Sequence, residues 1–322
     1  MNEEWTRLYQ ALAAKYEMGE KILSILKEEC AEETGVVFCP DHLGDTFWAG
    51  AFAGEYKRQH GYRKLLYITK AAYTEMLELF PEIDLTMPMG EKEMDALKFY
   101  FYLRHRYADG NVRLGSFPYF VMFQFPGVAL QQEINESYRS SDAAWEKILE
   151  LKAPTEKSRI RIPDTEKLSE WKEKYKNAVM LAPGAYSEEA VPISFWGKLT
   201  ERLKEMGLEV YVNHNGHDCD VMIKVAKPLA SSVVEMIQFG ECFRHFVGLR
   251  SGICDPLSQT SLRMTVLFTI APWKDTIELR EGEAGRHDLW QMGRKEGISC
   301  YEYLPQHAEL LIDRICEEIE KG

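Results

Sequence analysis

The residues best suited to chemistry lie in three short turns, each of which contains glycine. The first is HLGD at residues 42–45, where Asp45 stands between an apolar run and a helical pattern. The second is PGAYSEEAVP at 183–192, and the third is LRSGICD at 249–255. Glycine lets the backbone approach a ligand closely, and a helix that follows such a turn directs free N–H groups at an anion. Three such turns predict a phosphate-containing ligand.

Asp45 fits two roles. An aspartate at the start of a helix commonly serves as the N-cap, which contributes about 1 kcal/mol to stability. A carboxylate in the turn after a buried strand is also suited to act as a general base. The two roles are compatible, although an aspartate that accepts N–H hydrogen bonds has a lowered pKa and is a weaker base. The turn by itself leaves both roles open.

The elements that position these turns alternate between strand and helix. Short, continuously apolar runs are typical of strands covered on both faces of a parallel sheet, and the stretches between them have helical spacing. In the first half we predict strands at 35–39 and 64–69, helices at 3–30, 46–63 and 71–83, and mixed helix and strand across the aromatic-rich residues 91–150. In the second half we predict strands at 177–184, 208–213, 245–249 and 264–272, and helices at 192–207, 231–243 and 306–322.

This order predicts an α/β protein with two Rossmann-like domains that face a central cleft, preceded by an N-terminal helical extension. Residues 152–165 contain two prolines and many charges, which is typical of a linker. We therefore assign residues 1–155 to an N-terminal domain and 156–304 to a second domain. Residues 305–322 form a final helix, for which packing back on the N-terminal domain is one option.

Composition excludes several classes of protein. With 322 residues, 45% hydrophobic and 28% charged, the chain is a globular protein long enough for two domains. A net charge of −12 argues against nucleic-acid binding. The seven cysteines are scattered without a C-x-x-C pair, so neither a disulfide framework nor a zinc ribbon is expected. The N-terminus lacks the apolar core of a signal peptide and no apolar run approaches about 18 residues, so we expect a cytoplasmic protein.

Four stretches resemble, in order and approximate spacing, the GT-B glycosyltransferases and in particular the bacterial lipopolysaccharide heptosyltransferase family, glycosyltransferase family 9. GVVFCPDHLGDTFWAGAF is similar to that family's first strand, Gly-Asp turn and first helix. NAVMLAPGAYSEEAVPISFWGKLTERLKEMGLEVYV is similar to the start of its donor domain. SSVVEMIQFGECFRHFVGLRSGICDPLS and MTVLFTIAP are similar to a late helix, a Ser-Gly turn and the strand that follows.

The resemblance implies transfer of a sugar from a nucleotide-sugar to an acceptor, with inversion and with neither a bound metal nor another cofactor. The acceptor hydroxyl must lose a proton as it attacks, which requires a base. The family's aspartate carries over to Asp45. The leaving diphosphate needs N–H donors or cations. The predicted donor-binding residues are Gly44, Pro183, Gly184, Ser187, Asn215, Arg250, Ser251, Gly252 and Asp255, and the predicted acceptor-binding residue is His42, for which an exposed turn histidine is the alternative.

The chain departs from the family's pattern at three places. The family usually has an acidic residue where this chain has Arg250, and a histidine where it has Asp255. The lysine common after the Pro-Gly turn is absent, and Glu188 and Glu189 stand nearby instead. Arg250 could face the diphosphate, since its planar fork suits phosphate oxygens, it could pair with Asp255, or it could be an ordinary surface arginine. Asp255 could also cap a helix or touch the sugar.

The polar loop NHNGHDCD at 213–220 is open to three interpretations. Its histidines and aspartates are metal-ligand types, and Asp-x-Asp holds manganese in the other glycosyltransferase fold, GT-A. Because the loop follows a strand of the second domain, a position near the nucleoside or plain exposure to solvent fits better. We therefore predict no metal site and place only Asn215 near the donor.

Together these observations lead us to expect a hexosyl- or heptosyltransferase-like enzyme of surface polysaccharide synthesis, such as lipopolysaccharide or capsule. Its partners would be a nucleotide-sugar donor and a saccharide or glycolipid acceptor, with no nucleic acid and at most peripheral membrane contact. A nucleotide-sugar epimerase or hydrolase of the same fold is the alternative enzyme. A non-catalytic nucleotide- or sugar-binding protein is the alternative of a different class.

Overall fold

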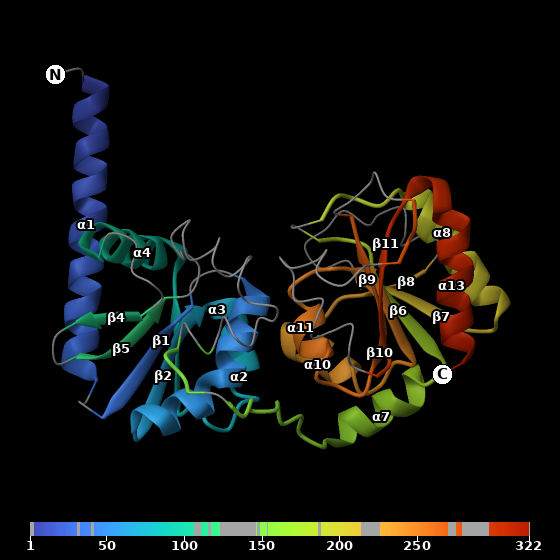
Figure 1. Cartoon of the computed structure of the whole chain (residues 1–322), viewed down its shortest axis with the longest axis horizontal. Coiled ribbons are helices and arrows are strands. Elements are labelled where there is room, and N and C mark those ends of the chain that lie inside the picture. The colour runs from blue at the N-terminus through green and yellow to red at the C-terminus, as the bar shows by residue number, and fades with distance from the viewer. Residues whose placement is uncertain are drawn as a thin grey trace. The chain divides into compact units, whose positions relative to one another are not determined.

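The computed structural model describes most of the chain and divides it into two compact units. The described residues are 3–30, 33–39, 42–105, 111–114, 117–122, 146, 149–152, 154–185, 188–213, 226–269, 275–278 and 296–321. The units are Met1–Arg161 and Ile162–Gly322, whereas the sequence placed this boundary between residues 155 and 156. Each unit contains its own α/β sheet (Figure 1), as the alternating pattern predicted.

The sheet of the first unit is mainly parallel. Its strand order is β3-β2-β1-β5-β4, and only β4 runs antiparallel to its neighbour β5. Both strands predicted in this half are confirmed, as β1 and β2. The elements in chain order are α1 (Glu3–Glu29), β1 (Thr34–Phe38), α2 (Leu43–His60), β2 (Lys64–Lys70), α3 (Ala71–Leu77), β3 (Leu85–Met89), α4 (Glu91–His105), β4 (Asn111–Leu114) and β5 (Phe117–Met122).

Helices pack against this sheet in the first unit. Leu23 and Leu26 of α1 and Leu97 of α4 form one apolar cluster with Val36 and Phe38 of β1. The two helices approach closely at Gly19, where an added Cβ would lie 2.4 Å from the carbonyl oxygen of Ala96. The N-terminal part of α1 extends beyond α4 (Figure 1). Helix α3 ends earlier than predicted, at Leu77, because Pro81 disfavours helical geometry in the residue before it.

The sheet of the second unit is parallel throughout, in the order β11-β10-β9-β6-β7-β8. Read by position along the chain, this is 3-2-1-4-5-6 from β8 to β11, the order of Rossmann dinucleotide-binding folds. The four strands predicted here are confirmed, as β6, β7, β9 and β10. The elements are α7 (Glu166–Tyr175), β6 (Ala178–Ala182), α8 (Ile193–Glu205), β7 (Glu209–Asn213), β8 (Lys227–Leu229), α10 (Val233–Phe239), β9 (His245–Leu249), α11 (Cys254–Leu257), β10 (Arg263–Phe268), β11 (Ile298–Glu302), a 3-10 turn (Pro305–His307) and α13 (Ala308–Glu320).

Alternate residues of these strands supply two cores. Val179 and Leu181 face α8 and α13 on one side, and Met180 faces α7 and α10 on the other. The final helix α13 buries its apolar stripe in the first of these cores, within the second unit. Additional packing of this helix on the first unit stays a prediction. Its five buried apolar residues are Leu311, Ile312, Ile315, Cys316 and Ile319.

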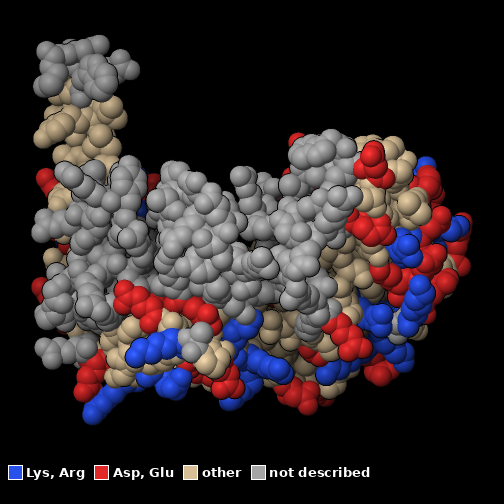
Figure 2. All heavy atoms as spheres, in the orientation of Figure 1, with Lys and Arg blue, Asp and Glu red and all other residues tan. Residues whose placement is uncertain are grey.

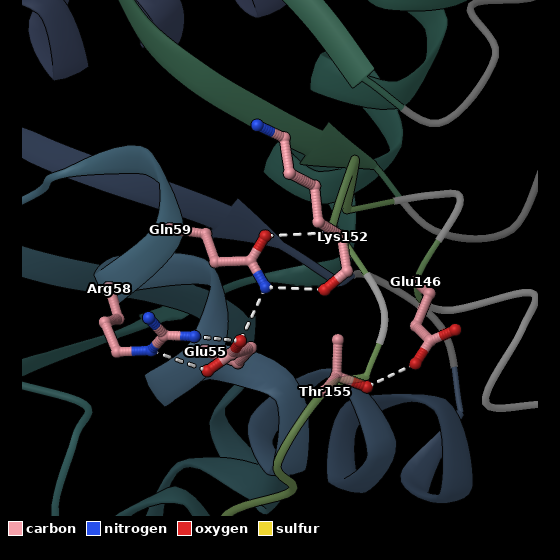
Figure 3. A network of polar contacts seen from close by, with 6 residues as sticks. All are labelled: Glu55, Arg58, Gln59, Glu146, Lys152 and Thr155. Carbon is pink, nitrogen blue, oxygen red and sulfur yellow. Dashed lines mark hydrogen bonds and ion pairs between the residues drawn. The ribbon is translucent and has the colours of Figure 1, made fainter.

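The stretch predicted as a linker is held along helix α2 of the first unit. The side-chain amide of Gln59 donates to the carbonyl oxygen of Lys152 at 3.0 Å and accepts from its N–H at 2.7 Å (Figure 3). Glu55, buried in the same helix, accepts from Gln59 and Arg58. Further on, the amide of Ser158 donates to the carbonyl of Ala51 at 2.7 Å. A segment with the composition of a free linker is thus part of the first unit.

Charged side chains of both signs are interspersed over the described surface of the second unit (Figure 2). Exposed pairs such as Arg202 with Asp313 join α8 to α13. Such pairs each contribute little to stability, because water screens them. Within the described part of the chain, no helix is long and apolar enough to cross a membrane.

Candidate functional site

The first turn places Asp45 in the opening turn of α2. The N-cap residue is His42, which has extended backbone angles and whose side chain makes no capping hydrogen bond. Asp45 is therefore the third residue of the helix, so the N-cap role expected for it is not the one that it has. Its carboxylate is half-buried, His42 is exposed, and Gly44 is buried. A negative charge in this first turn is favoured by the helix dipole.

Buried hydroxyl and thiol groups lie beneath this turn. The Thr46 hydroxyl lies 3.3 Å from that of Thr69 and donates to the Cys39 sulfur at 3.7 Å. The Tyr67 hydroxyl donates to the carbonyl of Thr46 at 2.9 Å. Burial raises the pKa of Tyr67 well above its ordinary value, and the nearby Cys39 and Asp45 add to the rise. Tyr67 is thus a neutral hydrogen-bond donor that fixes the backbone next to Asp45. Sequence reasoning missed Thr46 and Tyr67, which sit in apolar runs that give no sign of polar contacts.

The turn of Asp45 lies at the switch point of its sheet. From β1 the chain moves outward to β2 and β3, and β5 then pairs with the opposite side of β1. In open α/β sheets, ligands bind at such reversals, outside the carboxyl ends of the strands. The strand order of the first unit therefore selects the turn that contains Asp45.

The second sheet selects the other two turns in the same way. Its order reverses between β6 and β9, which pair in register with Ala182 opposite Gly248. Pro183 and Gly184 follow β6, and Ser251 and Gly252 come shortly after β9. The Pro-Gly and Ser-Gly turns, 67 residues apart in sequence (251 − 184), are therefore neighbours at the carboxyl edge of one sheet. An added Cβ on Gly248 would lie 2.9 Å from that of Ala182, so only glycine fits between the strands.

Arg250 and Asp255 form an ion pair beside the Ser-Gly turn. Nη2 of Arg250 lies 2.9 Å and 3.1 Å from the two carboxylate oxygens of Asp255, and Nη1 donates to the carbonyl of Ser251. The side chains are 10% and 1% exposed. Of the three roles expected for Arg250, the structure supports pairing with Asp255, and the burial of the side chain excludes an ordinary surface arginine. Asp255 lies in the first turn of α11, where its carboxylate is occupied by the arginine.

Glu188 fastens the loop after the Pro-Gly turn to the end of β10. One of its carboxylate oxygens accepts from the amide and the hydroxyl of Thr269, both at 2.7 Å. The amide of Glu189 donates to the Thr269 hydroxyl at 2.8 Å. The acidic residues near the position of the family's lysine therefore have a structural contact of their own. Thr269 was not expected, because the contact spans 81 residues.

Two predicted donor-binding residues, Ser187 and Asn215, lie outside the described residues, as does most of the polar loop at 213–220. Their roles stay predictions. Among the residues that the structure does describe, no three His, Cys, Asp or Glu side chains gather as a metal site would require. The described candidate residues thus form a separate group in each unit. The first unit holds half-buried Asp45 above buried hydroxyl groups, and the second unit holds two adjacent glycine turns.

No protein-family model and no curated protein sequence matches the chain. Solved structures do. The ADP-heptose lipopolysaccharide heptosyltransferase II of E. coli is 10% identical with a TM-score of 0.58, over 89% of this chain and 99% of that one. A family 9 glycosyl transferase of Veillonella parvula is 12% identical with a TM-score of 0.58, over 91% and 99%. An E. coli heptosyltransferase solved with ADP-2-deoxy-2-fluoro heptose is 9% identical with a TM-score of 0.51, over 89% and 99%.

The matches cover 89–91% of this chain and 99% of each neighbour, and at identities of 9–12% they show a shared fold. They match the family that the four sequence stretches resemble. The chain has the fold of the family 9 heptosyltransferases.

Proposed function

We propose that this protein is a glycosyltransferase that moves a sugar from a nucleoside diphosphate sugar to a saccharide or glycolipid acceptor. One observation supports the proposal: in both sheets, the predicted site residues lie where the strand order reverses. Each sheet reverses its strand order beside a turn that contains predicted site residues, Asp45 in the first unit and the two glycine turns in the second. Parallel sheets bind ligands at these reversals.

In this proposal the first unit holds the acceptor and supplies the base. The acceptor hydroxyl gives its proton to the carboxylate of Asp45 while its oxygen bonds to the anomeric carbon of the donor. The bond from that carbon to the diphosphate breaks, and the nucleoside diphosphate leaves with the electron pair. Attack from the face opposite the leaving group inverts the anomeric centre, and no step requires a metal. His42, exposed at the N-cap of α2, would contact the acceptor in this proposal.

The second unit holds the donor. The amide N–H groups of Gly252 and Ile253 donate to no backbone acceptor within the described residues, and in this proposal they bind the diphosphate. Consecutive free N–H groups form a concavity that suits anions and stabilises charge on a leaving group. Pro183 and Gly184 lie beside them at the same sheet edge. The fold neighbours include an enzyme named for ADP-heptose, which favours a nucleoside diphosphate sugar as the donor class.

The proposed setting is surface polysaccharide or lipopolysaccharide synthesis in the cytoplasm, and one fold neighbour is named as a lipopolysaccharide heptosyltransferase. In that setting we propose that the chain meets a glycolipid acceptor through peripheral membrane contact.

Nucleotide binding and product analysis test the proposal. Thermal unfolding with ADP-, GDP-, UDP- and CDP-sugars should show one nucleotide that raises the midpoint, since a ligand that binds only the folded state stabilises it. That donor, incubated with and without saccharide acceptors, should yield a glycosylated product only when the acceptor is present. Free sugar or an epimerised donor without acceptor would instead identify a hydrolase or an epimerase. Binding without any product would identify a nucleotide-binding protein.

A further inference from the structure

The turn after β9 is braced from within by one arginine. Arg250, the first residue after the strand, reaches across the turn to both carboxylate oxygens of Asp255. Its second terminal nitrogen donates to the carbonyl oxygen of Ser251, which also accepts from the amide of Cys254 at 2.9 Å. The guanidinium thus connects the start of the turn to the carbonyl of Ser251 and to the first turn of α11.

The geometry of the pair does not suit direct contact with a ligand. An arginine that binds phosphate presents its planar fork to the anion. Here one side of the fork faces Asp255 and the other faces the backbone, and the side chain is almost fully buried. Asp255 is more deeply buried still, and its two oxygens are bound by the same arginine.

We propose that Arg250 and Asp255 are positioning residues, which hold Ser251 and Gly252 so that backbone N–H groups, and neither charged side chain, bind the diphosphate of the donor. It follows that neither residue recognises the sugar of the donor. The inference rests on the proposed function for the identity of the ligand, but the brace itself can be tested without it.

Asp255→Asn separates positioning from direct binding because the two roles predict changes of opposite sign. The probe is whichever of ADP, GDP, UDP and CDP stabilises the wild-type protein most, titrated by calorimetry. If the pair positions the turn, Asn weakens its bond to Arg250 and the Kd rises, by about tenfold for the loss of one charge-assisted contact. If Arg250 binds phosphate directly, removing the neutralising carboxylate tightens binding and the Kd falls, which would overturn the inference.

Arg250→Lys gives a second measurement of the same kind. Lysine keeps the positive charge but lacks the planar fork, so it cannot contact Asp255 twice and also reach the Ser251 carbonyl. Positioning therefore predicts a Kd that rises as much as in Asp255→Asn, whereas a phosphate-binding cation would be largely replaced. If both variants unfold at a lower temperature but keep the wild-type Kd, the pair contributes to stability and does not position the turn for binding. That result would also overturn the inference.

Amide hydrogen exchange reads the brace without any nucleotide. In Asp255→Asn the amide of Cys254, which bonds to the braced Ser251 carbonyl, should exchange at least about tenfold faster than in the wild type, as expected for a locally opened segment. Unchanged exchange would overturn the inference. If the wild type binds none of the four nucleotides, the proposed function fails, and this exchange measurement alone decides whether the brace exists.

Asp313→Asn is the matched control. Asp313 also pairs with an arginine, Arg202 at 3.1 Å, but both side chains are more than half exposed and lie on α8 and α13. This variant should leave both the nucleotide Kd and the exchange of the Cys254 amide at their wild-type values.

Discussion

The turns after β1 and β9 have the same architecture but use their aspartates in opposite ways. In each, a buried parallel strand ends at the switch point of its sheet and a helix follows. Asp45 in the first turn is half-buried at the start of α2, above buried hydroxyl and thiol groups. Asp255 in the second turn is only 1% exposed and is bound by both oxygens to Arg250.

The difference shows how environment decides what a carboxylate does. A carboxylate locked to a buried arginine is held ionised and contributes to the shape of the backbone, and it is a poor proton acceptor. A carboxylate that is partly open to solvent can exchange a proton with an incoming hydroxyl. We therefore propose that Asp45 takes part in the chemistry and that Asp255 holds the shape of its turn, and the first two predictions below test that division.

The largest effect is expected for Asp45→Asn. Loss of the proposed general base should lower kcat for sugar transfer by roughly 10² to 10⁴-fold, with the Kd for the donor nucleotide close to the wild-type value because we propose that the donor binds to the second unit. Transfer rates and calorimetric titration of the same preparations measure both. Asp95→Asn, an exposed carboxylate of α4 paired with Lys15, is the matched control and should keep full activity. If the Asp45→Asn enzyme kept the wild-type turnover, Asp45 would not be the general base.

The next effect is on stability. Arg250→Leu leaves the Asp255 carboxylate buried without its cation, which should cost about 3–5 kcal/mol in the free energy of unfolding. Arg202→Leu, in an exposed pair, should change it by no more than about 1 kcal/mol. Urea unfolding of the two variants and the wild type makes the measurement. Equal losses in both would mean that the buried pair does not brace its turn.

Acid should loosen the second unit through His245. Burial, and then the charges of Arg263 and Arg244, lower the pKa of this histidine to about 3 from an ordinary 6.5. Because the folded state keeps the ring neutral, stability is fully present above about pH 6.5 and falls toward pH 3, by up to about 1.4 kcal/mol per pH unit. Unfolding at pH 7, 5.5 and 4.5 should show a shallower pH slope for His245→Gln, whose amide can still donate to Thr265. Identical slopes would exclude the histidine as the cause.

The smallest effects concern helix caps. His42 at the N-cap of α2 makes no side-chain hydrogen bond, whereas Ser232 at the N-cap of α10 forms a capping box with Glu235. His42→Ser should stabilise the protein by about 0.5–1 kcal/mol, and Ser232→Ala should destabilise it by about 1 kcal/mol. Thermal unfolding measures both. A destabilised His42→Ser protein would show that the histidine already supports the turn, and a raised KM for the acceptor would support its predicted binding role.

Much of the fold could be predicted from sequence because the strands are short and apolar on both faces. Short apolar runs of this kind seldom adopt another structure in a globular protein. Three examples, each of which forms a central or near-central strand, are GVVFC, KLLYIT and HFVGL. Edge strand β8, only three residues long, and the helix α7 were missed, because KPL carries no apolar pattern and EKLSEWKEKY is mostly charged.

The site was predictable in position but less so in its contacts. A turn at the carboxyl end of a strand can be located from the sequence, and Asp45, Gly184 and Gly252 all lie in such turns. Contacts between turns depend on strand order, which local sequence does not contain. The bond from Thr269 to Glu188 exists only because these residues meet at the same edge of the sheet. The pair of Arg250 and Asp255 could be foreseen as one of two options because its partners are five residues apart.

The fastening of residues 154–161 to the first unit determines where the molecule can be divided. The amide of Arg161 donates to the carbonyl of Leu79, and the next residue, Ile162, packs against the core of the second unit. A fragment that stopped at residue 155 would leave the Ala51 and Leu79 carbonyls without the amide donors of Ser158 and Arg161. The second fragment would begin with residues 156–161, separated from the part of the first unit that they contact. Separate expression of the halves, or exchange of one half between related proteins, should therefore use the peptide bond between Arg161 and Ile162.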